Sequence, residues 1–169
     1  MDTILLLARL YLGLGIAVHG AQKLTGWFGG YGLAGTGGFF EQLGFKPGRL
    51  FAALAGLGES TGGLLVALGL LGPIGPAIVV LVMLVAAGTV HIKNGFLSSK
   101  NGVELPLLYA IGAALLAFTG PGAYSLDNAL GLHALASVHV AWIALASAIA
   151  GAMLNIGARH RPVPPKAAA

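Results

Sequence analysis

The chain has 169 residues, enough for one domain. Only 8% of the residues are charged and 57% are hydrophobic, with a mean hydropathy of +0.89, whereas an ordinary soluble domain is about 25% charged. This composition excludes an ordinary soluble domain, and nine basic residues against five acidic ones are too few to line a nucleic-acid groove. The absence of cysteine excludes disulfides, thiol catalysis and thiolate metal ligands within this chain.

Five segments predict membrane-spanning helices, because about 20 mostly apolar residues cross a hydrocarbon core of roughly 30 Å. They are residues 3–24, 50–71, 74–92, 105–119 and 132–156, the fourth being short and expected to begin at Val103 or Glu104. Unbroken Val, Leu and Ile runs could also form buried strands, but their length and the need to satisfy every backbone group within lipid favour helices. A cleaved signal peptide at the N-terminus is disfavoured because that segment has no basic start and contains Arg9.

Basic residues indicate the orientation of the chain in the bilayer. They follow the first, third and fifth segments, at Lys23, Lys46, Arg49, Lys93, Lys100, Arg159, Arg161 and Lys166. With five spans these three regions share one side, and the positive-inside rule places that side in the cytoplasm. We therefore expect the N-terminus outside and the C-terminus in the cytoplasm.

The connection between the first two spans, residues 25–46, is more than a plain linker. Trp27, Phe28 and Tyr31 would sit at the level of the lipid headgroups as an aromatic anchor. The glycine-rich stretch that follows is pliable, and residues 39–43 could form one or two interfacial helical turns. The alternative is that this connection is a mobile lid over a binding site.

Ionisable residues inside the spans are the informative ones, because each costs about 2.5–3.5 kcal/mol at the centre of a membrane helix. Four residues meet this description: Arg9, His19, Glu59 and His91. Lys23 and Glu104 lie at span ends, where a long side chain reaches the interface cheaply.

Glu59 lies nine residues into its span, which is roughly 14 Å deep at about 1.5 Å per residue. Arg9 enters from the opposite face to a depth that an extended arginine could nearly bridge, so an Arg9–Glu59 ion pair is one expectation. The sequence leaves two roles open for Glu59, a functional acid and a buried structural partner.

His19, Lys23, His91 and Glu104 are expected at a similar depth near the cytoplasmic end. A histidine and a glutamate there could shuttle protons or bind a carbonyl oxygen. The alternative is that the histidines are interfacial residues and that the lysines only determine topology. No His-x-x-His or Glu-x-x-His pair marks a metal site in the bundle, and no haem motif is present, so we predict neither cofactor.

Small residues predict close helix packing in two spans. Gly58 and Gly62 form a small-xxx-small pattern in the second span. Ala144, Ala148 and Ala152 form a stripe at helical spacing in the fifth. Both patterns indicate packing and carry no chemistry.

The sequence resembles the DoxX family of small bacterial membrane proteins over about residues 4–128. The matching residues are Arg9, Gly13, His19-Gly20, Lys23-Leu24, Gly58-Glu59, Gly62-Gly63, Gly69, His91, residues 94–96 and 102–104, and the GPGAYSLD run at 120–127. The resemblance implies an all-α, four-helix transmembrane bundle over residues 1–131, in the inner membrane of a bacterium. Residues 132–157 would add a fifth membrane helix beyond that core, and residues 158–169 a disordered cytoplasmic tail.

The resemblance also implies a redox role, since one branch of the family is similar to the small subunit of thiosulfate:quinone oxidoreductase. Another relative is reported as the membrane part of a complex with a thiosulfate sulfurtransferase and a superoxide dismutase. Our leading hypothesis is a quinone-linked oxidoreductase subunit that receives electrons from a soluble or membrane redox partner. We predict His91, Glu59 and Glu104 as catalytic residues for oxygen binding and proton relay, and we predict Arg9, His19 and Lys23 as residues that bind the quinone.

Two other classes of function stay open at this stage. The chain could be a non-enzymatic anchor in the lipid bilayer that recruits a soluble oxidoreductase through its cytoplasmic loops. It could also be a small proton-coupled transporter or a lipid-modifying protein that uses Glu59. Assembly of several copies into a homo-oligomer is compatible with each of these functions.

Overall fold

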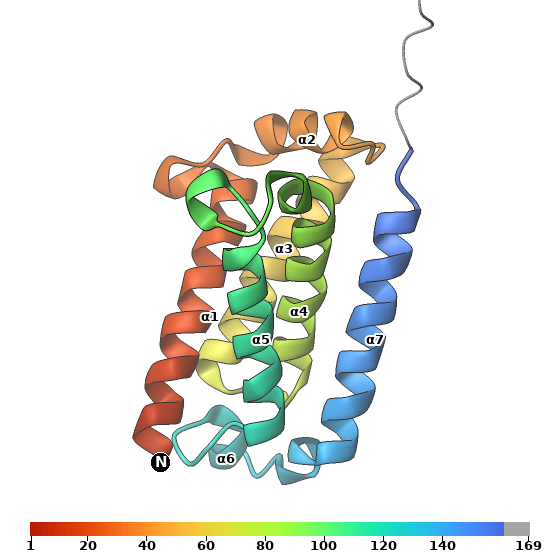
Figure 1. Ribbon diagram of the computed structural model, residues 1–169. Helices are drawn as coiled ribbons and strands as arrows, with labels where there is room; N and C mark the ends of the chain where they lie inside the picture. Colours follow the sequence, from red (N-terminus) through yellow and green to blue (C-terminus); the bar gives the residue numbers. More distant parts are fainter. Residues whose placement is uncertain (161–169) are drawn as a thin grey trace, which may run out of the picture.

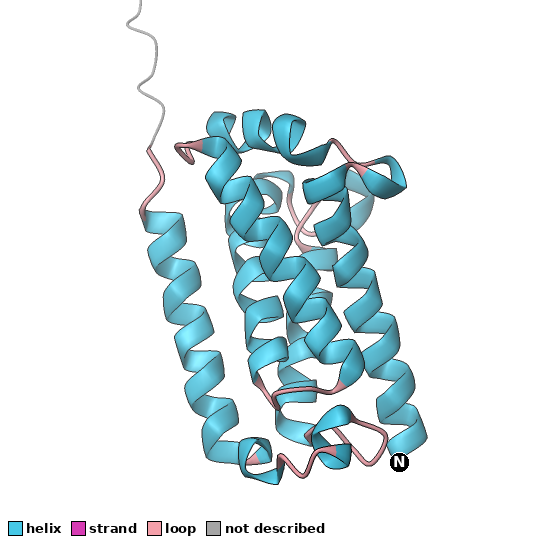
Figure 2. Cartoon of the chain, turned by 180° about the vertical axis from the view of Figure 1, so that it is seen from behind, coloured by secondary structure: helices cyan, strands magenta, loops and turns pink. Residues whose placement is uncertain are grey.

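The computed structural model describes residues 1–160, in which the secondary structure is entirely helical (Figures 1 and 2). The long helices of the bundle are α1 (Asp2–Thr25), α3 (Gly48–Leu68), α4 (Ile74–Ala86), α5 (Glu104–Thr119) and α7 (Val138–Gly157). Successive long helices run in opposite directions, so that the start of α1 and the end of α7 lie at opposite ends of the bundle (Figure 1). The predicted all-α bundle is thereby confirmed.

Four of these helices are long and apolar enough to cross a membrane by length and composition: α1, α3, α7 and the helical stretch Ile74–Asn94 that contains α4. The fifth candidate, α5, has only 16 residues, or roughly 24 Å at about 1.5 Å per residue. Its shortness agrees with the short fourth span that the sequence indicates.

Short helices close both ends of the bundle (Figure 1). The helix α2 (Gly32–Gln42) crosses one end, preceded by the short turn η1 (Trp27–Gly29). The other end carries α6 (Leu126–Ala129) and η5 (His133–Ala136). Between α4 and α5 lie η2 (Ala87–His91), η3 (Ile92–Asn94) and η4 (Ser98–Lys100). The α2 helix is longer than the one or two turns predicted near residues 39–43.

The last long helix begins later than the sequence indicates. A membrane helix was expected from residue 132, but α7 starts at Val138. Ser137 is its N-cap, and the Ser137 hydroxyl accepts a hydrogen bond from the Val140 N–H, which satisfies one of the free N–H groups at a helix start. Upstream, Gly131 has a φ of 71°, and residues 133–136 form η5 instead of continuing the helix.

Glycines allow α1 and α3 to pack backbone against backbone. A Cβ atom on Gly63 would lie 2.5 Å from the Gly13 carbonyl oxygen, and one on Gly20 would lie 2.6 Å from the Gly56 carbonyl oxygen. Small residues at such positions are the usual way for membrane helices to approach closely. The predicted pair Gly58 and Gly62 serves a different contact, because both glycines face side chains of α4.

The helix α4 is the centre of the core, since it packs against α3, α5 and α7. Its buried Val79, Val80 and Met83 belong to one apolar cluster with alanines of α5 and α7. On α7 the buried residues are Ala141, Leu145, Ala148 and Ala152. The predicted alanine stripe is thus partly correct, because Ala148 and Ala152 are buried whereas Ala144 is only half-buried. The additional helix packs on the core.

At the end of the bundle that α6 covers, polar side chains connect α1, the turn between α3 and α4, and the segment after α5. The buried guanidinium of Arg9 donates hydrogen bonds to the backbone oxygens of Pro121 and Tyr124. Asp127, which is 1% exposed, accepts hydrogen bonds from the N–H groups of Leu71 and Gly72 at 2.8 and 2.6 Å. The carboxylate therefore holds the turn between α3 and α4 against the segment that follows α5.

Replacing Asp127 with alanine is expected to destabilise the protein by about 2–4 kcal/mol, because two backbone N–H groups would lose their buried acceptor and Arg9 would lose a nearby negative charge. Titration of the detergent-solubilised protein with sodium dodecyl sulfate measures this loss. Asp2→Ala is the matched control, since Asp2 is more exposed and, among residues 1–160, accepts a single hydrogen bond, from the Ala123 N–H. Equal effects of the two substitutions would contradict the assigned role of Asp127.

The C-terminal end of the described chain lies against the connection after α2. The His160 N–H donates a hydrogen bond to the Gly44 carbonyl oxygen at 2.9 Å. Residues 158–160 therefore lie against the bundle. The prediction of disorder for the remaining tail concerns residues 161–169, which are outside the described residues.

Candidate functional site

A cavity of about 760 Å³ lies beneath α2, between α3 and α4. Its lining is largely aliphatic and aromatic, with Phe39 and Phe40 from α2, Phe51 from α3, and Val82 and Val85 from α4. A concave, mostly apolar site with a few polar groups is the usual form of a small-molecule site. The polar groups that line this cavity include Gln22, Lys23, Thr36, Glu59, Thr89, His91 and Asn155.

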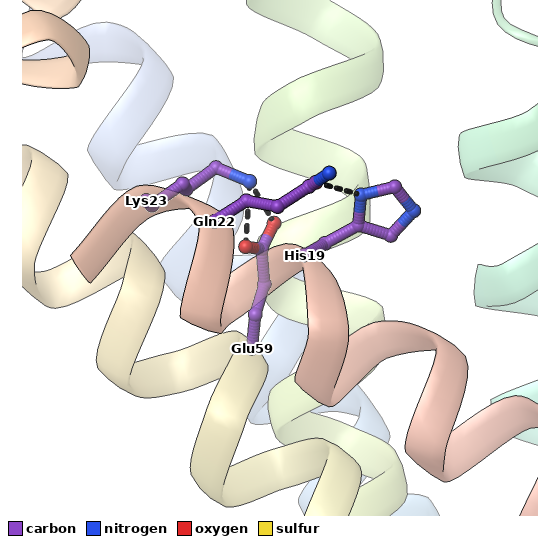
Figure 3. A network of polar contacts seen from close by, with 4 residues as sticks. All are labelled: His19, Gln22, Lys23 and Glu59. Carbon is purple, nitrogen blue, oxygen red and sulfur yellow. Dashed lines mark hydrogen bonds and ion pairs between the residues drawn. The ribbon is translucent and has the colours of Figure 1, made fainter. Parts of the chain in front are cut away.

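An ion pair between α1 and α3 lies at the wall of this cavity. The Nζ atom of Lys23 lies 2.8 Å from Oε1 and 2.6 Å from Oε2 of Glu59 (Figure 3). The Glu59 side chain is 4% exposed and the Lys23 side chain 27%. Glu59 lies in the middle of α3, so its charge depends on this partner for stabilisation.

The α1–α3 packing explains why Lys23 is the partner and Arg9 is not. The contact of Gly13 with Gly63 and Ala67 sets the antiparallel register of the two helices. In that register Arg9 lies beside Gly69, which is ten residues or roughly 15 Å from Glu59 along α3. The expected Arg9–Glu59 pair is therefore wrong. Side chains on a helix lean toward its N-terminus, so Lys23 extends into the bundle toward Glu59.

His19 points away from the ion pair (Figure 3). Its Nδ1 atom lies 3.0 Å from Oε1 of Gln22, and its ring packs edge-on against Tyr109 of α5 with 6.3 Å between centroids. The Gln22 Nε2 group donates to the Phe28 carbonyl oxygen, which orients the amide so that its oxygen faces the imidazole. Because that oxygen can only accept, Nδ1 of His19 carries a proton. His19 is not among the residues that line the cavity.

His91 lines the cavity and lies where the helical geometry changes at the end of α4. Residues 87–91 form a turn of π-helix, a rare geometry that is often found at functional sites. The His91 Nδ1 atom lies 2.9 Å from the Asn101 carbonyl oxygen, to which the Asn94 amide also donates. Nδ1 is therefore a donor, and Nε2 is left as an acceptor when the ring is neutral. Glu59 and His91 line one cavity, as the sequence hypothesis requires.

Glu104 and Arg9 have different environments from those that we predicted. The Glu104 Oε2 atom accepts a hydrogen bond from the Ser98 N–H at 2.7 Å, which closes the connection between α4 and α5. Neither Glu104 nor Arg9 is among the residues that line the cavity. Their predicted roles in proton relay and quinone binding therefore receive no support from the geometry. Both side chains hold backbone segments in place instead.

Several cavity residues were not singled out from the sequence. They include Thr36 and Phe40 on α2, Thr89 on η2 and Asn155 on α7. Thr36 and Phe40 are four apart on α2 and share a helix face, which was the available signal. Asn155 gives an equally simple signal as a lone amide near the end of an apolar span. Within residues 1–160, no three His, Asp or Glu side chains gather closely enough to hold a metal ion.

The long apolar helices of the bundle define a small multi-pass membrane protein. The DoxX family model matches residues 4–92, just over half of the chain, and the chain belongs to the DoxX family. The match contains Lys23, Glu59 and His91, whereas α5, α6 and α7 lie beyond it. No curated protein and no solved structure matches the sequence.

Proposed function

We propose that the cavity beneath α2 binds the headgroup of a membrane quinone and that the chain is the membrane subunit of a quinone-linked oxidoreductase. The observation that carries this proposal is a buried Lys23–Glu59 ion pair in a largely apolar cavity that His91 also lines. Quinone headgroups are flat and apolar, with two carbonyl oxygens that need hydrogen-bond donors. The aromatic and aliphatic lining suits the ring, and the ammonium and imidazole groups suit the oxygens.

The chemistry that this site would support is proton supply. Reduction of a quinone to a quinol consumes two electrons and two protons, and the electrons would come from a redox partner protein. Lys23 has three N–H donors, which allows it to hold Glu59 and still donate to a ligand oxygen. Glu59 would pass a proton to the reduced ligand oxygen and return to the carboxylate form, which the Lys23 ammonium stabilises. His91 Nε2 would accept from a hydroxyl when the ring is neutral and donate to a carbonyl when it is protonated.

Glu59→Gln is expected to weaken quinone binding at least tenfold, because the amide cannot hold the Lys23 ammonium as a carboxylate does. The measurement is equilibrium binding of decyl-ubiquinone and a short-chain menaquinone analogue to the full-length protein in lipid nanodiscs. His91→Ala is expected to act in the same direction.

Glu104→Gln provides the matched control, since it makes the same chemical change to a glutamate that does not line the cavity. It should leave quinone binding unchanged. The proposal fails if the wild-type protein shows no saturable binding of either analogue, or if Glu59→Gln binds both as tightly as the wild type does.

A further inference from the structure

Asn155 is a polar residue of the cavity that comes from the added helix α7. The other polar side chains of that helix, His139 and Ser147, are exposed, whereas Asn155 is half-buried and lines the cavity. The helix α7 lies entirely beyond residues 4–92, the region that the family model matches. The matched region therefore does not supply this amide.

Close packing of α7 on α4 and on the adjoining η2 brings Asn155 to the cavity wall. A Cβ atom on Gly151 would lie 3.0 Å from the Leu81 Cδ1 atom, and one on Gly88 would lie 2.9 Å from the Ile156 Cδ1 atom. These two contacts place Asn155 beside the part of α4 that contributes Val85 and Ala86 to the cavity.

Asn155 lies two residues before the end of α7, and an amide on a membrane helix often forms a hydrogen bond with a neighbouring helix. Hydrogen bonds among residues 1–160 involve the neighbouring polar groups of the cavity wall, such as Thr89 and His91, but none involves the Asn155 side chain. The amide is thus a donor and an acceptor at the cavity wall, with no partner among the described residues.

We propose that Asn155 orients the ligand by a direct hydrogen bond to one of the two oxygens attached to the quinone ring. This inference rests on the proposed quinone site. An asparagine amide carries both an NH₂ donor and a carbonyl acceptor. The NH₂ group donates to a carbonyl oxygen of the oxidised ligand, and the amide oxygen accepts from a hydroxyl of the reduced ligand. Asn155 therefore holds both forms without changing its own protonation state, in contrast to Glu59 and His91.

The test compares Asn155→Leu with the wild type in binding decyl-ubiquinone and, under anaerobic conditions, decyl-ubiquinol. We expect the leucine variant to bind both forms about five- to tenfold more weakly, the effect of losing about one hydrogen bond. Leucine suits a membrane helix, so the variant should fold. Ser147→Ala is the control, because Ser147 is an exposed polar residue of the same helix.

Asn155→Asp provides a second variant with a polar side chain of nearly the same size. An ionised carboxylate accepts but cannot donate, so this variant should lose affinity for the oxidised ligand more than for the reduced one. If both variants bind both forms within twofold of the wild type while Glu59→Gln binds weakly, the role of Asn155 is overturned and the proposed function stands. If the wild type itself binds neither form, the proposed function fails, and the role of Asn155 fails with it.

Discussion

Replacement of Lys23 with methionine is expected to destabilise the protein by about 3–5 kcal/mol, the usual loss when one partner of a buried ion pair is removed. Glu59 is 4% exposed and both of its carboxylate oxygens are held by the Lys23 ammonium. Without that partner, the carboxylate must stay charged in an apolar setting or take up a proton. Unfolding by sodium dodecyl sulfate in mixed micelles gives the free energy of unfolding. Lys93→Met is the control, because Lys93 is exposed.

The double variant Lys23→Met/Glu59→Leu separates the structural role of the pair from its functional role. Replacing a buried ion pair with apolar residues of similar size is often neutral or stabilising. We therefore expect the double variant to regain stability to within about 1 kcal/mol of the wild type. Quinone binding should nevertheless stay lost. A double variant that is stable and still binds both quinone analogues like the wild type would show that the pair is only structural.

A Gly63→Val substitution is expected to be the other severe change, with a destabilisation of about 3 kcal/mol or more. The first atom of the new side chain would lie 2.5 Å from the Gly13 carbonyl oxygen and 2.7 Å from the Ala17 nitrogen. These are backbone atoms of a helix, and they cannot turn aside as a flexible side chain can. The helices α1 and α3 would have to separate, which would also move Lys23 away from Glu59.

The same unfolding titration measures this effect, and quinone binding gives a second readout that should fall in parallel. Gly157→Ala is the matched control, because nothing lies within 4 Å of a Cβ atom placed on Gly157. Alanine is the better helix former by about 1 kcal/mol, so this change should be neutral or slightly stabilising. A Gly63→Val protein as stable as the Gly157→Ala protein would show that the close α1–α3 contact is not needed.

Predictions about individual helices from the sequence were more successful than predictions about side-chain partners. The span that contains Glu59 agrees with the structure, where α3 covers Gly48–Leu68. Errors arose where flanking residues compete with helix formation, as at residues 132–137, where Ser137 caps a helix that starts later than expected. The alanine stripe of α7 shows a similar partial success, since its spacing was right but Ala144 is only half-buried.

At the candidate site, the prediction of individual residues was again more successful than the prediction of their partners. Glu59 and His91 stood out in the sequence because ionisable groups in a membrane helix are costly, and the structure places both on one cavity. The partner of Glu59 could not be predicted, because depth along a helix gives no information about the register between two helices. Lys23 was predicted as a residue at a span end that binds the quinone, and not as the partner of Glu59.

The sequence alone determined that this protein is a bundle of membrane-spanning helices. A membrane helix satisfies its backbone hydrogen bonds within its own segment, so each span can be recognised from the length of its apolar run. Only the tertiary structure decided that Lys23 pairs with Glu59, that Arg9 serves the opposite end, and that α7 brings Asn155 to the cavity. These pairings depend on helix register and rotation, which are set by contacts such as Gly13 against Gly63, between residues far apart in the chain.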